Sequence, residues 1–482
     1  MRPFAVLAIA AGLAGCTLEP HYVRPSPAVP GAWPTGPAYP TPSAAPLPSL
    51  SYRDIFKDPH LQTVIGQALA NAQDLRVAMA NVEIARAEYV VQRGELFPHV
   101  DASGAFSENQ TRLGSSVAGV PAGQREINRS YAATVGFSAF ELDLFGRLRS
   151  LSHAAQDRYF ASEAGARAAR LTLVGEVASA YLTLAADRSL LAIAGETVVS
   201  AQRTVDLTRA KLTGGISPRT DLTQAETLLD QARSDIAQLT TQVAQDRNAL
   251  ELLVGAPVPD AELPGSIEAV DGLLGEAPAG LDSRILLRRP DVVEAEYGLK
   301  ATNAQIGAAR ANFFPTISLT ALAGAASPAL HALFAGRNQT WQFGGSAALP
   351  LFAGGQNVGN LALARGERDL AVAQYQQAIQ RAFREVADAL ARRGTITEQM
   401  SAQTDLETAA AENYRLSEAR YREGIDPYLI TLDAQRTLYS ARRTLASTRL
   451  VRAANLVALY QALGGDQLID SLPPPKVETG KG

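Results

Sequence analysis

Four stretches of the chain alternate between apolar and other side chains with a period of two, and they fall in two pairs. The apolar positions are Val100, Ala102, Gly104 and Phe106; Tyr131, Ala133, Val135, Phe137 and Ala139; Ile317, Leu319, Ala321 and Ala323; and Trp341, Phe343, Gly345, Ala347 and Leu349. This pattern predicts strands with one apolar face, which is typical of transmembrane β-strands, although a soluble β-hairpin is the alternative for each pair. The segments Ser107–Ser130 and Gly324–Thr340 are rich in glycine and polar residues and are expected to be surface loops.

The segments that follow the strand pairs predict very long helices, at 149–213 and 356–423. A helix of about 65 residues reaches ~100 Å, which is too long to be buried in an ordinary globule. Shorter helices are expected to return at 220–254 and 428–463. A helix of about 35 residues is expected to open each half and to end at a Phe-Pro pair, because proline stops a helix. These lengths predict two short helices stacked end to end beside each long one.

The returning helix of the first half carries a coiled-coil seam. Its positions follow alternating spacings of three and four residues: Leu222, Ala225, Leu229, Ala232, Ile236, Leu239, Val243, Asp246, Leu250 and Leu253. This spacing predicts close packing against a partner helix, and Asp246 is the one position that breaks the apolar seam.

Matched sequence markers indicate that the chain is a tandem duplication. Asp74 to Pro98 and Asp291 to Pro315 each span 24 positions, and both segments end in Phe-Pro. The two halves also share a Gly-Ile-x-Pro motif, at Gly215-Ile216-Ser217-Pro218 and at Gly424-Ile425-Asp426-Pro427. In each half a second glycine follows 40 residues after the glycine of this motif, at Gly255 and at Gly464. The repeats are therefore expected at 55–255 and 285–465, with a linker at 256–284 and a C-terminal tail at 466–482.

The N-terminus has the features of a bacterial lipoprotein signal. Arg2 precedes an apolar run from Phe4 to Leu13, and Leu13-Ala14-Gly15-Cys16 resembles a lipobox. Residues 1–15 are thus predicted to be a signal peptide and Cys16, the only cysteine, to carry the lipid, including a palmitate chain. An unmodified cysteine after an ordinary signal peptide is the alternative. Thr17 in place of an aspartate favours the outer membrane, and the proline-rich residues 16–54 are expected to form an extended tether.

The rest of the composition excludes several classes of protein. No later segment offers 18 consecutive apolar residues, so we expect no transmembrane helix in the mature chain. The 44 Lys and Arg residues against 48 Asp and Glu give a net charge of −4, which makes no electrostatic case for nucleic-acid binding. The histidines are scattered, without metal-ligand spacing, at His21, His60, His99, His153 and His331. The sequence therefore predicts no metal site, no cofactor and no catalytic residue, in a protein that is not an enzyme.

The four predicted strands cannot close a barrel on their own. Closure needs about eight or more strands, and an open sheet edge in lipid is very costly. Several chains must then contribute to one barrel, which the long helices would continue as a shared tube. The predicted fold is a mixed α and β membrane protein with four transmembrane strands per chain and a helical barrel of coiled-coil hairpins.

Over nearly its whole mature length, the chain resembles the TolC-like outer-membrane efflux factors. The most similar group is the lipoprotein branch that serves resistance-nodulation-division pumps. The resemblance rests on residues 15–25 (Gly-Cys-Thr-Leu-Glu-Pro-His-Tyr-Val-Arg-Pro), 420–436 (Arg-Tyr-Arg-Glu-Gly-Ile-Asp-Pro-Tyr-Leu-Ile-Thr-Leu-Asp-Ala-Gln-Arg) and 458–465 (Ala-Leu-Tyr-Gln-Ala-Leu-Gly-Gly). It implies a homotrimer whose twelve strands form one barrel in the outer membrane, with an α-helical barrel extending into the periplasm. It also implies a periplasmic adaptor and an inner-membrane pump as partners, outer-membrane lipid around the barrel, and passive export of drugs or other small molecules in multidrug resistance.

The turns between the long and returning helices are the first candidate site. Glycine permits the chain reversal, and proline suits the start of the new helix. The candidate residues of the two turns are Gly214, Gly215, Pro218, Gly424, Ile425 and Pro427. The resemblance implies that these turns, at the end far from the membrane, also dock the adaptor and form the closed entrance.

Charged residues near the turns are candidates for a pore gate: Asp221, Tyr421, Arg422, Asp426 and Asp433. In a symmetric oligomer each acidic residue becomes a ring of like charges, which favours cations at a constriction. Solvated charges at helix ends are the alternative. Tyr421 and Asp433 match positions of the family's entrance network, whereas Ile430 stands where some members carry another aspartate.

Two other classes of function remain open from the sequence. One alternative is a channel of the same type that serves type I protein secretion or metal-ion efflux instead of drug export. A periplasmic coiled-coil scaffold lipoprotein explains the helices and the lipid, but it does not explain two β-hairpins at matched points of a duplication.

Overall fold

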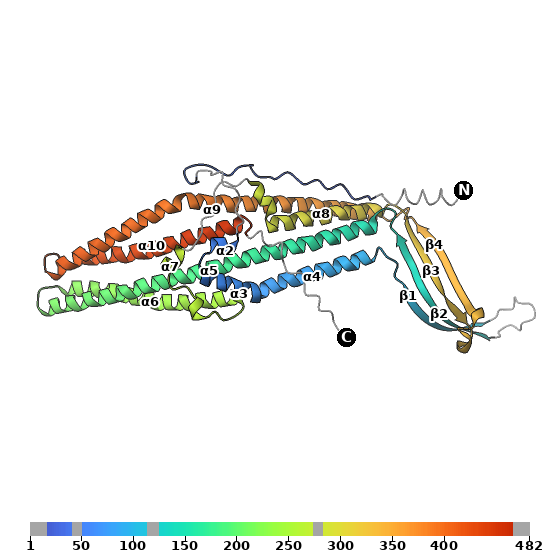
Figure 1. Cartoon of the computed structure of the whole chain (residues 1–482), viewed down its shortest axis with the longest axis horizontal. Helices are drawn as coiled ribbons and strands as arrows, with labels where there is room; N and C mark the ends of the chain where they lie inside the picture. The colour runs from blue at the N-terminus through green and yellow to red at the C-terminus, as the bar shows by residue number, and fades with distance from the viewer. Residues whose placement is uncertain (1–16, 41–50, 113–124, 273–282, 466–482) are drawn as a thin grey trace, which may run out of the picture. The chain divides into compact units, whose positions relative to one another are not determined.

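The computed structural model describes residues 17–40, 51–112, 125–272 and 283–465 (Figure 1). Contacts divide the chain into two units. The sheet unit comprises Met1–Pro25, Asn81–Ser162 and Ala295–Tyr375, and the helical unit comprises Ser26–Ala80, Glu163–Glu294 and Gln376–Gly482. Cys16, the predicted signal peptide and the predicted C-terminal tail lie outside the described residues.

The elements follow one another in the same order in both halves. The first half contains α2 (Tyr52–Ile55), α3 (Pro59–Asn71), α4 (Gln73–Gly94), β1 (Asp101–Arg112), β2 (Arg125–Leu142), α5 (Arg147–Thr213) and α6 (Arg219–Val254). Between the halves lie η1 (Asp260–Glu262), α7 (Ile267–Asp271) and η2 (Ser283–Arg288). The second half contains α8 (Pro290–Ala311), β3 (Thr316–Ser327), η3 (Leu330–Ala332), η4 (Gly336–Asn338), β4 (Gln339–Ala348), α9 (Gln356–Arg422) and α10 (Tyr428–Ala462).

The four strands form one antiparallel sheet in the order β1-β2-β3-β4 (Figure 1). One row of paired residues runs across it through Ala102, Val135, Ala323 and Trp341. Because directly paired residues point to the same face, the predicted apolar positions lie together on one face, which we call the apolar face. There are three exceptions: Ala139 lies in a β-bulge with a φ of 55°, and Val100 and Leu349 lie just outside β1 and β4.

The opposite face of the sheet, the polar face, carries serine and threonine side chains that bond across the strands. Ser103 and Thr134 hydroxyls lie 2.8 Å apart, and Ser318 and Ser346 hydroxyls lie 3.2 Å apart. The sheet therefore has one face suited to lipid and one suited to water, as the alternation predicted.

The strands are longer than the apolar alternation indicated. Strand β1 reaches Arg112 and β2 begins at Arg125, both inside the segment that was expected to be a loop. Sheet hydrogen bonds are made by the backbone, so pairing continues where the side chains become polar. There Arg129 donates to the Glu108 carboxylate across the strands, 3.0 Å apart.

The helical unit contains two helical hairpins, α5–α6 and α9–α10, and the short helices stack end to end as predicted. At the end of α6, a Cβ on Gly255 would lie 2.8 Å from the carbonyl oxygen of Asn71, just before α4 begins. At the end of α10, a Cβ on Gly464 would lie 3.4 Å from Arg289, just before α8 begins. Both glycines have a left-handed backbone, with φ of 71° and 90°, which lets the chain turn in this close space.

The prediction of a long opening helix is wrong in the second half and incomplete in the first. Helix α8 has only 22 residues, and a 3-10 segment precedes it. Pro290 lacks an amide donor, so it can occupy the first turn of α8 but not the interior of a longer helix. In the first half, the helix is interrupted at Ala72, whose ψ of 128° is not helical.

Helix α5 is the one helix in the described part of the chain that is long and apolar enough to cross a membrane by length and composition. This differs from the expectation that no such helix exists. Half of its most apolar stretch is buried in the helical unit, and Val177, Leu182 and Leu184 are fully buried there. Its apolar character is therefore accounted for by helix packing.

Residues 17–40 form no helix or strand, as their prolines predicted, but they contact the folded body closely. In the sheet unit, Arg24 donates two hydrogen bonds to the buried carboxylate of Glu296, at 2.9 and 2.8 Å. In the helical unit, the Trp33 ring stacks on Phe383 with 5.0 Å between centroids. This part of the predicted tether is thus a docked segment, because its aromatic and charged side chains find partners on the helices.

Candidate functional site

The two turns between long and returning helices share one backbone motif. After α5, the amide of Ile216 donates to the Lys211 carbonyl and that of Gly215 to the Leu212 carbonyl, both at 3.0 Å. After α9, Ile425 donates to the Arg420 carbonyl at 2.9 Å and Gly424 to that of Tyr421 at 3.1 Å. These are Schellman caps, which require a left-handed residue, and Gly215 and Gly424 have φ of 75° and 74°.

The returning helices begin in the same way at both turns. Pro218 and Pro427 occupy the N-cap positions of α6 and α10, with φ of −74° and −69°, so the ring fits without strain. Gly214 lies at the end of α5 and does not need a left-handed conformation. The predicted turn residues therefore occupy the positions where their backbone properties are used.

Polar side chains close each turn differently. In the first turn, the Ser217 hydroxyl donates to the Asp221 carboxylate at 2.7 Å. In the second, Arg420 donates twice to the Asp426 carboxylate, at 2.6 and 2.9 Å. The hydrogen bond from Arg420 lowers the pKa of Asp426 below its usual range. Asp426 therefore remains ionised and bound to its own turn.

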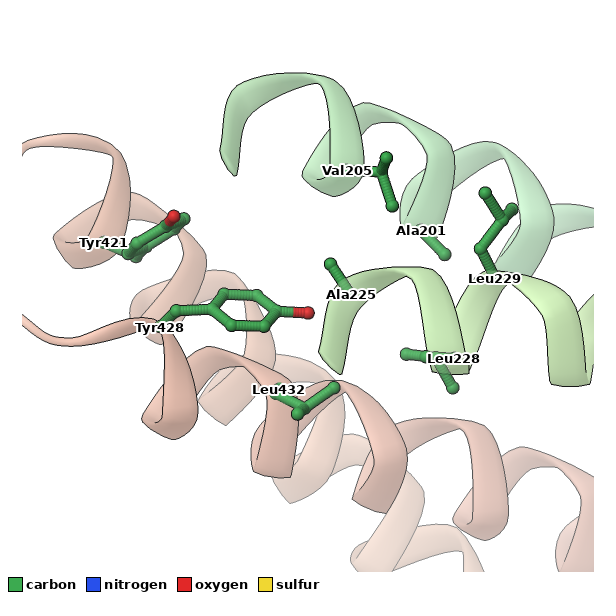
Figure 2. Close-up of a cluster of buried hydrophobic side chains, with 8 residues drawn as sticks. All are labelled: Ala201, Val205, Ala225, Leu228, Leu229, Tyr421, Tyr428 and Leu432. Carbon is green, nitrogen blue, oxygen red and sulfur yellow. The ribbon is translucent and has the colours of Figure 1, made fainter. Parts of the chain in front are cut away.

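A cluster of buried side chains joins the two hairpins near the turns (Figure 2). Helices α5 and α6 contribute Ala201, Val205, Ala225, Leu228 and Leu229, and the second hairpin contributes Tyr421, Tyr428 and Leu432. The rings of Tyr421 and Tyr428 lie 5.4 Å apart at a tilt of 54°. Two members of the cluster, Ala201 and Ala225, have small side chains, which allow the helices to approach closely in this region.

Tyr421 is the main polar link between the hairpins in this cluster. Its side chain is 4% exposed, and its hydroxyl lies 3.0 Å from the Thr208 hydroxyl on α5. Lys211, also on α5, donates to the Tyr421 carbonyl at 2.5 Å, and its ammonium lies 3.9 Å from the centre of the Tyr421 ring. Local sequence patterns do not identify Thr208 or Lys211 as partners of Tyr421, because these contacts depend on how the two halves pack.

Tyr428 differs from Tyr421 although both are buried. Its hydroxyl is buried and has no hydrogen-bond partner among the described residues. Burial raises the pKa of Tyr428, and the neighbouring Tyr421 raises it further. The ring of Tyr428 therefore stabilises the cluster by packing, while its hydroxyl is unsatisfied.

The remaining candidate gate residues are not gathered with Tyr421 in one network. Arg422 is exposed and lies 3.5 Å from Glu418 on the same helix. Asp433 is exposed, and no side-chain partner is recorded for it in the described part of the chain. Asp221 is half-buried beside its own turn. Within one chain, these charges face solvent or local partners.

Each turn also presents an exposed isoleucine. Ile216 is 76% exposed and Ile425 is 61% exposed, both at the residue that follows the left-handed glycine. In a Schellman cap this position usually packs against the preceding helical turn. Here it points to solvent, so the two turns offer matching apolar tips. Among the described residues, no group of His, Cys, Asp or Glu side chains is arranged to hold a metal ion.

Comparison with known proteins gives consistent results over nearly the whole chain. The family model described as outer membrane efflux protein matches residues 64–256 and 281–465. The chain is 45% identical over 475 residues to the toluene efflux pump outer membrane protein TtgC of Pseudomonas putida, covering 98% of this chain and 97% of that protein. It is 44% identical to the antibiotic efflux pump outer membrane protein ArpC of Pseudomonas putida, with the same coverage.

Solved structures agree with the sequence relatives. The structure of the open state of the Neisseria gonorrhoeae MtrE outer membrane channel superposes with a TM-score of 0.82 at 36% identity, covering 94% of this chain and 98% of that chain. The outer-membrane channel OprN superposes with a TM-score of 0.84 at 26% identity, covering 93% and 99% of the two chains.

Proposed function

Since this chain belongs to the outer membrane efflux protein family and is an outer-membrane channel component of an efflux pump, we propose that it is the passive exit duct of a three-part system. In this proposal three copies form the duct, a periplasmic adaptor contacts the helix turns, and an inner-membrane pump of the resistance-nodulation-division type supplies the energy. The names of the relatives refer to toluene and antibiotics, which supports small organic molecules as cargo.

The two-faced sheet with open edges is the observation that carries the proposal. Among the residues that the structure describes, β1 and β4 are the edges of the four-stranded sheet, and each has an unpaired side. In lipid, unpaired backbone groups cost several kcal/mol each, so the edges must pair with other strands. Pairing β1 of one copy with β4 of the next closes a barrel that has lipid on its apolar face and water on its polar face.

Exposed apolar stripes on two helices support the same assembly. Val77, Ile84 and Val91 follow one another on α4 at intervals of seven residues, and all three are exposed. Leu363 and Leu370 on α9 have the same spacing and are also exposed. Stripes of this period pack against neighbouring helices in coiled coils, so we assign them to contacts between copies of the chain.

The segment after Cys16 supports lipid anchoring at the membrane surface. Arg310 donates to the Leu18 carbonyl at 3.1 Å, and Asn303 donates to the Pro20 carbonyl at 2.7 Å. Together with the Arg24 contact to Glu296, these bonds hold residues 17–25, the N-terminal strap, antiparallel to α8. The strap therefore begins beside the C-terminal end of α8, shortly before β3 begins. Lipid chains on Cys16 would reach the bilayer there without a long spacer.

The helix turns are the proposed docking and gating region. The exposed Ile216 and Ile425 offer small apolar tips of the kind that anchor protein contacts. We assign Tyr421 to the gate as a latch between the hairpins, because its side chain is buried against α5 instead of facing solvent. Asp433 and Arg422 are exposed charges that can line the entrance in a trimer, whereas Asp426 is held by Arg420.

Purification of the full chain from outer membranes tests the proposal directly. Native mass spectrometry should give the mass of three chains with an added lipid on each, and the protein should form ion-conducting pores in planar bilayers. Cys16→Ala should lose the lipid mass and retain the trimer and its conductance. A monomer that forms no pores would overturn the duct, and an unmodified wild-type cysteine would overturn the anchor alone. In cells, loss of the protein should raise the accumulation of a fluorescent organic dye.

A further inference from the structure

The segment between β3 and β4 folds back over the apolar face of the sheet. Ala325 and Ser327, whose side chains belong to that face, are buried, whereas Ala326 between them is exposed on the polar face. Leu333 of the segment is buried as well. Asn338 donates to the Ala332 carbonyl at 2.6 Å, and the Ala329 amide donates to the Ser327 hydroxyl at 3.2 Å. The segment therefore has a definite structure of its own.

A groove of about 550 Å³ lies between this segment and the sheet. Its floor is made of small side chains from three strands, among them Ala102, Gly104, Ala133 and Ala323, and its wall includes Phe334. Phe334 is 82% exposed, which is unusual for a phenylalanine beside an apolar groove. A groove of this size and lining is typical of sites that take an apolar ligand.

The segment that forms the wall of the groove is basic, and its Arg337 lies in sequence between two residues that line the groove, Ala335 and Gln339. Arg337 and His331 lie in the same segment and are exposed, and the sequence from 317 to 366 contains no aspartate or glutamate. No ion pair is recorded for Arg337 within the described ranges. A guanidinium without a carboxylate partner is well suited to bind a phosphate, because its planar donors match phosphate oxygens.

The groove lies at the end of the strands that meets the outer leaflet. Strand β3 follows α8 and β4 precedes α9, so the connection between the two strands is at the opposite strand ends from those helices (Figure 1). In the proposed duct the helices extend into the periplasm, which places this connection on the outer side. The lipid characteristic of that leaflet, lipid A, is phosphorylated and carries several acyl chains.

We propose that this groove binds lipid A, with an acyl chain on the small-residue floor and a phosphate on Arg337. The groove is formed within one chain, on the apolar face, so trimer assembly through the strand edges leaves it open. The inference rests on the proposed orientation of the duct, and it deepens that function by assigning a specific lipid partner. The exposed Phe334 and Trp341 would then contact lipid instead of water.

Lipid binding by the purified, full-length trimer tests the proposal. Delipidated protein in a mild detergent is titrated with lipid A and, separately, with phosphatidylethanolamine, and bound lipid is counted by native mass spectrometry. Ala133→Phe fills the groove, and Arg337→Gln removes a charge from the segment that forms its wall. Ala132→Phe is the matched control, because Ala132 is the neighbouring residue on the polar face.

Wild type and Ala132→Phe should bind one lipid A per chain and prefer it to phosphatidylethanolamine. Ala133→Phe and Arg337→Gln should each weaken lipid A binding by about tenfold or more. Equal binding of the two lipids by wild type, or unchanged lipid A binding by Arg337→Gln, would overturn the site. Arg337 is exposed, so this variant remains informative if Ala133→Phe fails to assemble. A wild-type trimer that conducts but does not select lipid A contradicts only this inference, whereas absence of trimers and pores contradicts the duct.

Discussion

A pair of carboxyl groups in the helical unit should make the stability of this protein depend on pH. Burial, a hydrogen bond with Asp246 on α6 and the charge of Asp246 together raise the pKa of Asp187 on α5 to about 7, and burial is the largest cause. One Asp246 oxygen is buried without a partner among the described residues. Two carboxylates cannot donate to each other, so the pair is satisfied only when it holds a proton. The basic residues next to them in sequence are engaged elsewhere: Arg188 donates to the Pro264 carbonyl and Arg247 to Glu251.

The expected size of the effect follows from the displacement of this pKa. Between its ordinary value of 3.8 and about 7, the Asp187 shift corresponds to ~4 kcal/mol, and solvent screening of a partly buried group reduces this to about 2 kcal/mol per chain. Because the pKa is raised in the folded state, the stabilising contribution is complete below pH ~4 and is lost as pH rises toward 7. Asp246→Asn replaces the second carboxyl with an amide that donates to Asp187 at any pH. This variant should therefore gain stability relative to wild type at pH 8 and show no gain at pH 4.

Unfolding of the detergent-solubilised trimer at several pH values measures this difference. Urea midpoints are followed by circular dichroism from about pH 4 to about pH 8, at one protein concentration, since oligomer stability depends on concentration. Asp230→Asn is the control, because Asp230 lies on the same helix with a side chain that is 71% exposed. The urea midpoint of this control should change with pH in the same way as that of the wild type. If the urea midpoint of Asp246→Asn also changes with pH as that of the wild type does over the whole range, the two carboxyl groups do not share a proton and the reasoning is wrong.

Three further predictions address the turn region and the N-terminal strap. Tyr421→Phe removes the hydroxyl bonded to Thr208 and should lower the free energy of unfolding by about 1 kcal/mol. Tyr428→Phe removes a hydroxyl that has no partner among the described residues, so the free energy of unfolding should stay the same or rise. Equal thermal midpoints for the two variants would contradict this difference. Glu296→Gln weakens the hold on the strap and should speed chymotryptic cleavage after Tyr22, so an unchanged cleavage rate argues against the docked strap. Combined Ile216→Asp and Ile425→Asp should preserve the trimer and weaken adaptor binding at least about tenfold by surface plasmon resonance; undiminished binding removes the turns from the docking site.

The sheet was predictable from the sequence because its stabilisation follows a simple period. Lipid on one side and water on the other select side chains at every second position, and this selection is visible in each strand alone. The strand ends were not predictable, since residues such as Glu108 and Arg129 continue the pairing after the apolar pattern stops. The turns were predictable for a similar local reason, because a left-handed backbone strongly favours glycine at Gly215 and Gly424.

The contacts between the two halves were not predictable from local patterns. Tyr421 was identified as a gate candidate from a family resemblance, but its partners Thr208 and Lys211 lie more than 200 positions away in the sequence. The break of the seam at Asp246 was visible, whereas its pairing with Asp187 required the packing of α5 against α6. Buried polar partners depend on tertiary geometry, so a single sequence locates one member of such a pair and leaves the other unspecified.

The arrangement of polar contacts indicates where the two hairpins can separate. Each hairpin is continuous through its own backbone, but near the turns the hairpins are joined to each other by side chains. Tyr421 bonds to Thr208 at the turn cluster, and Gln435 donates to the Ser200 hydroxyl at 3.1 Å farther along the helices. A side-chain hydrogen bond contributes about 1 kcal/mol, whereas unwinding a helix breaks one backbone bond per residue and exposes its packed face. A movement that opens the turn end should therefore shift the α9–α10 hairpin as a rigid pair away from α5, and Tyr421 is the contact that such a movement must break first.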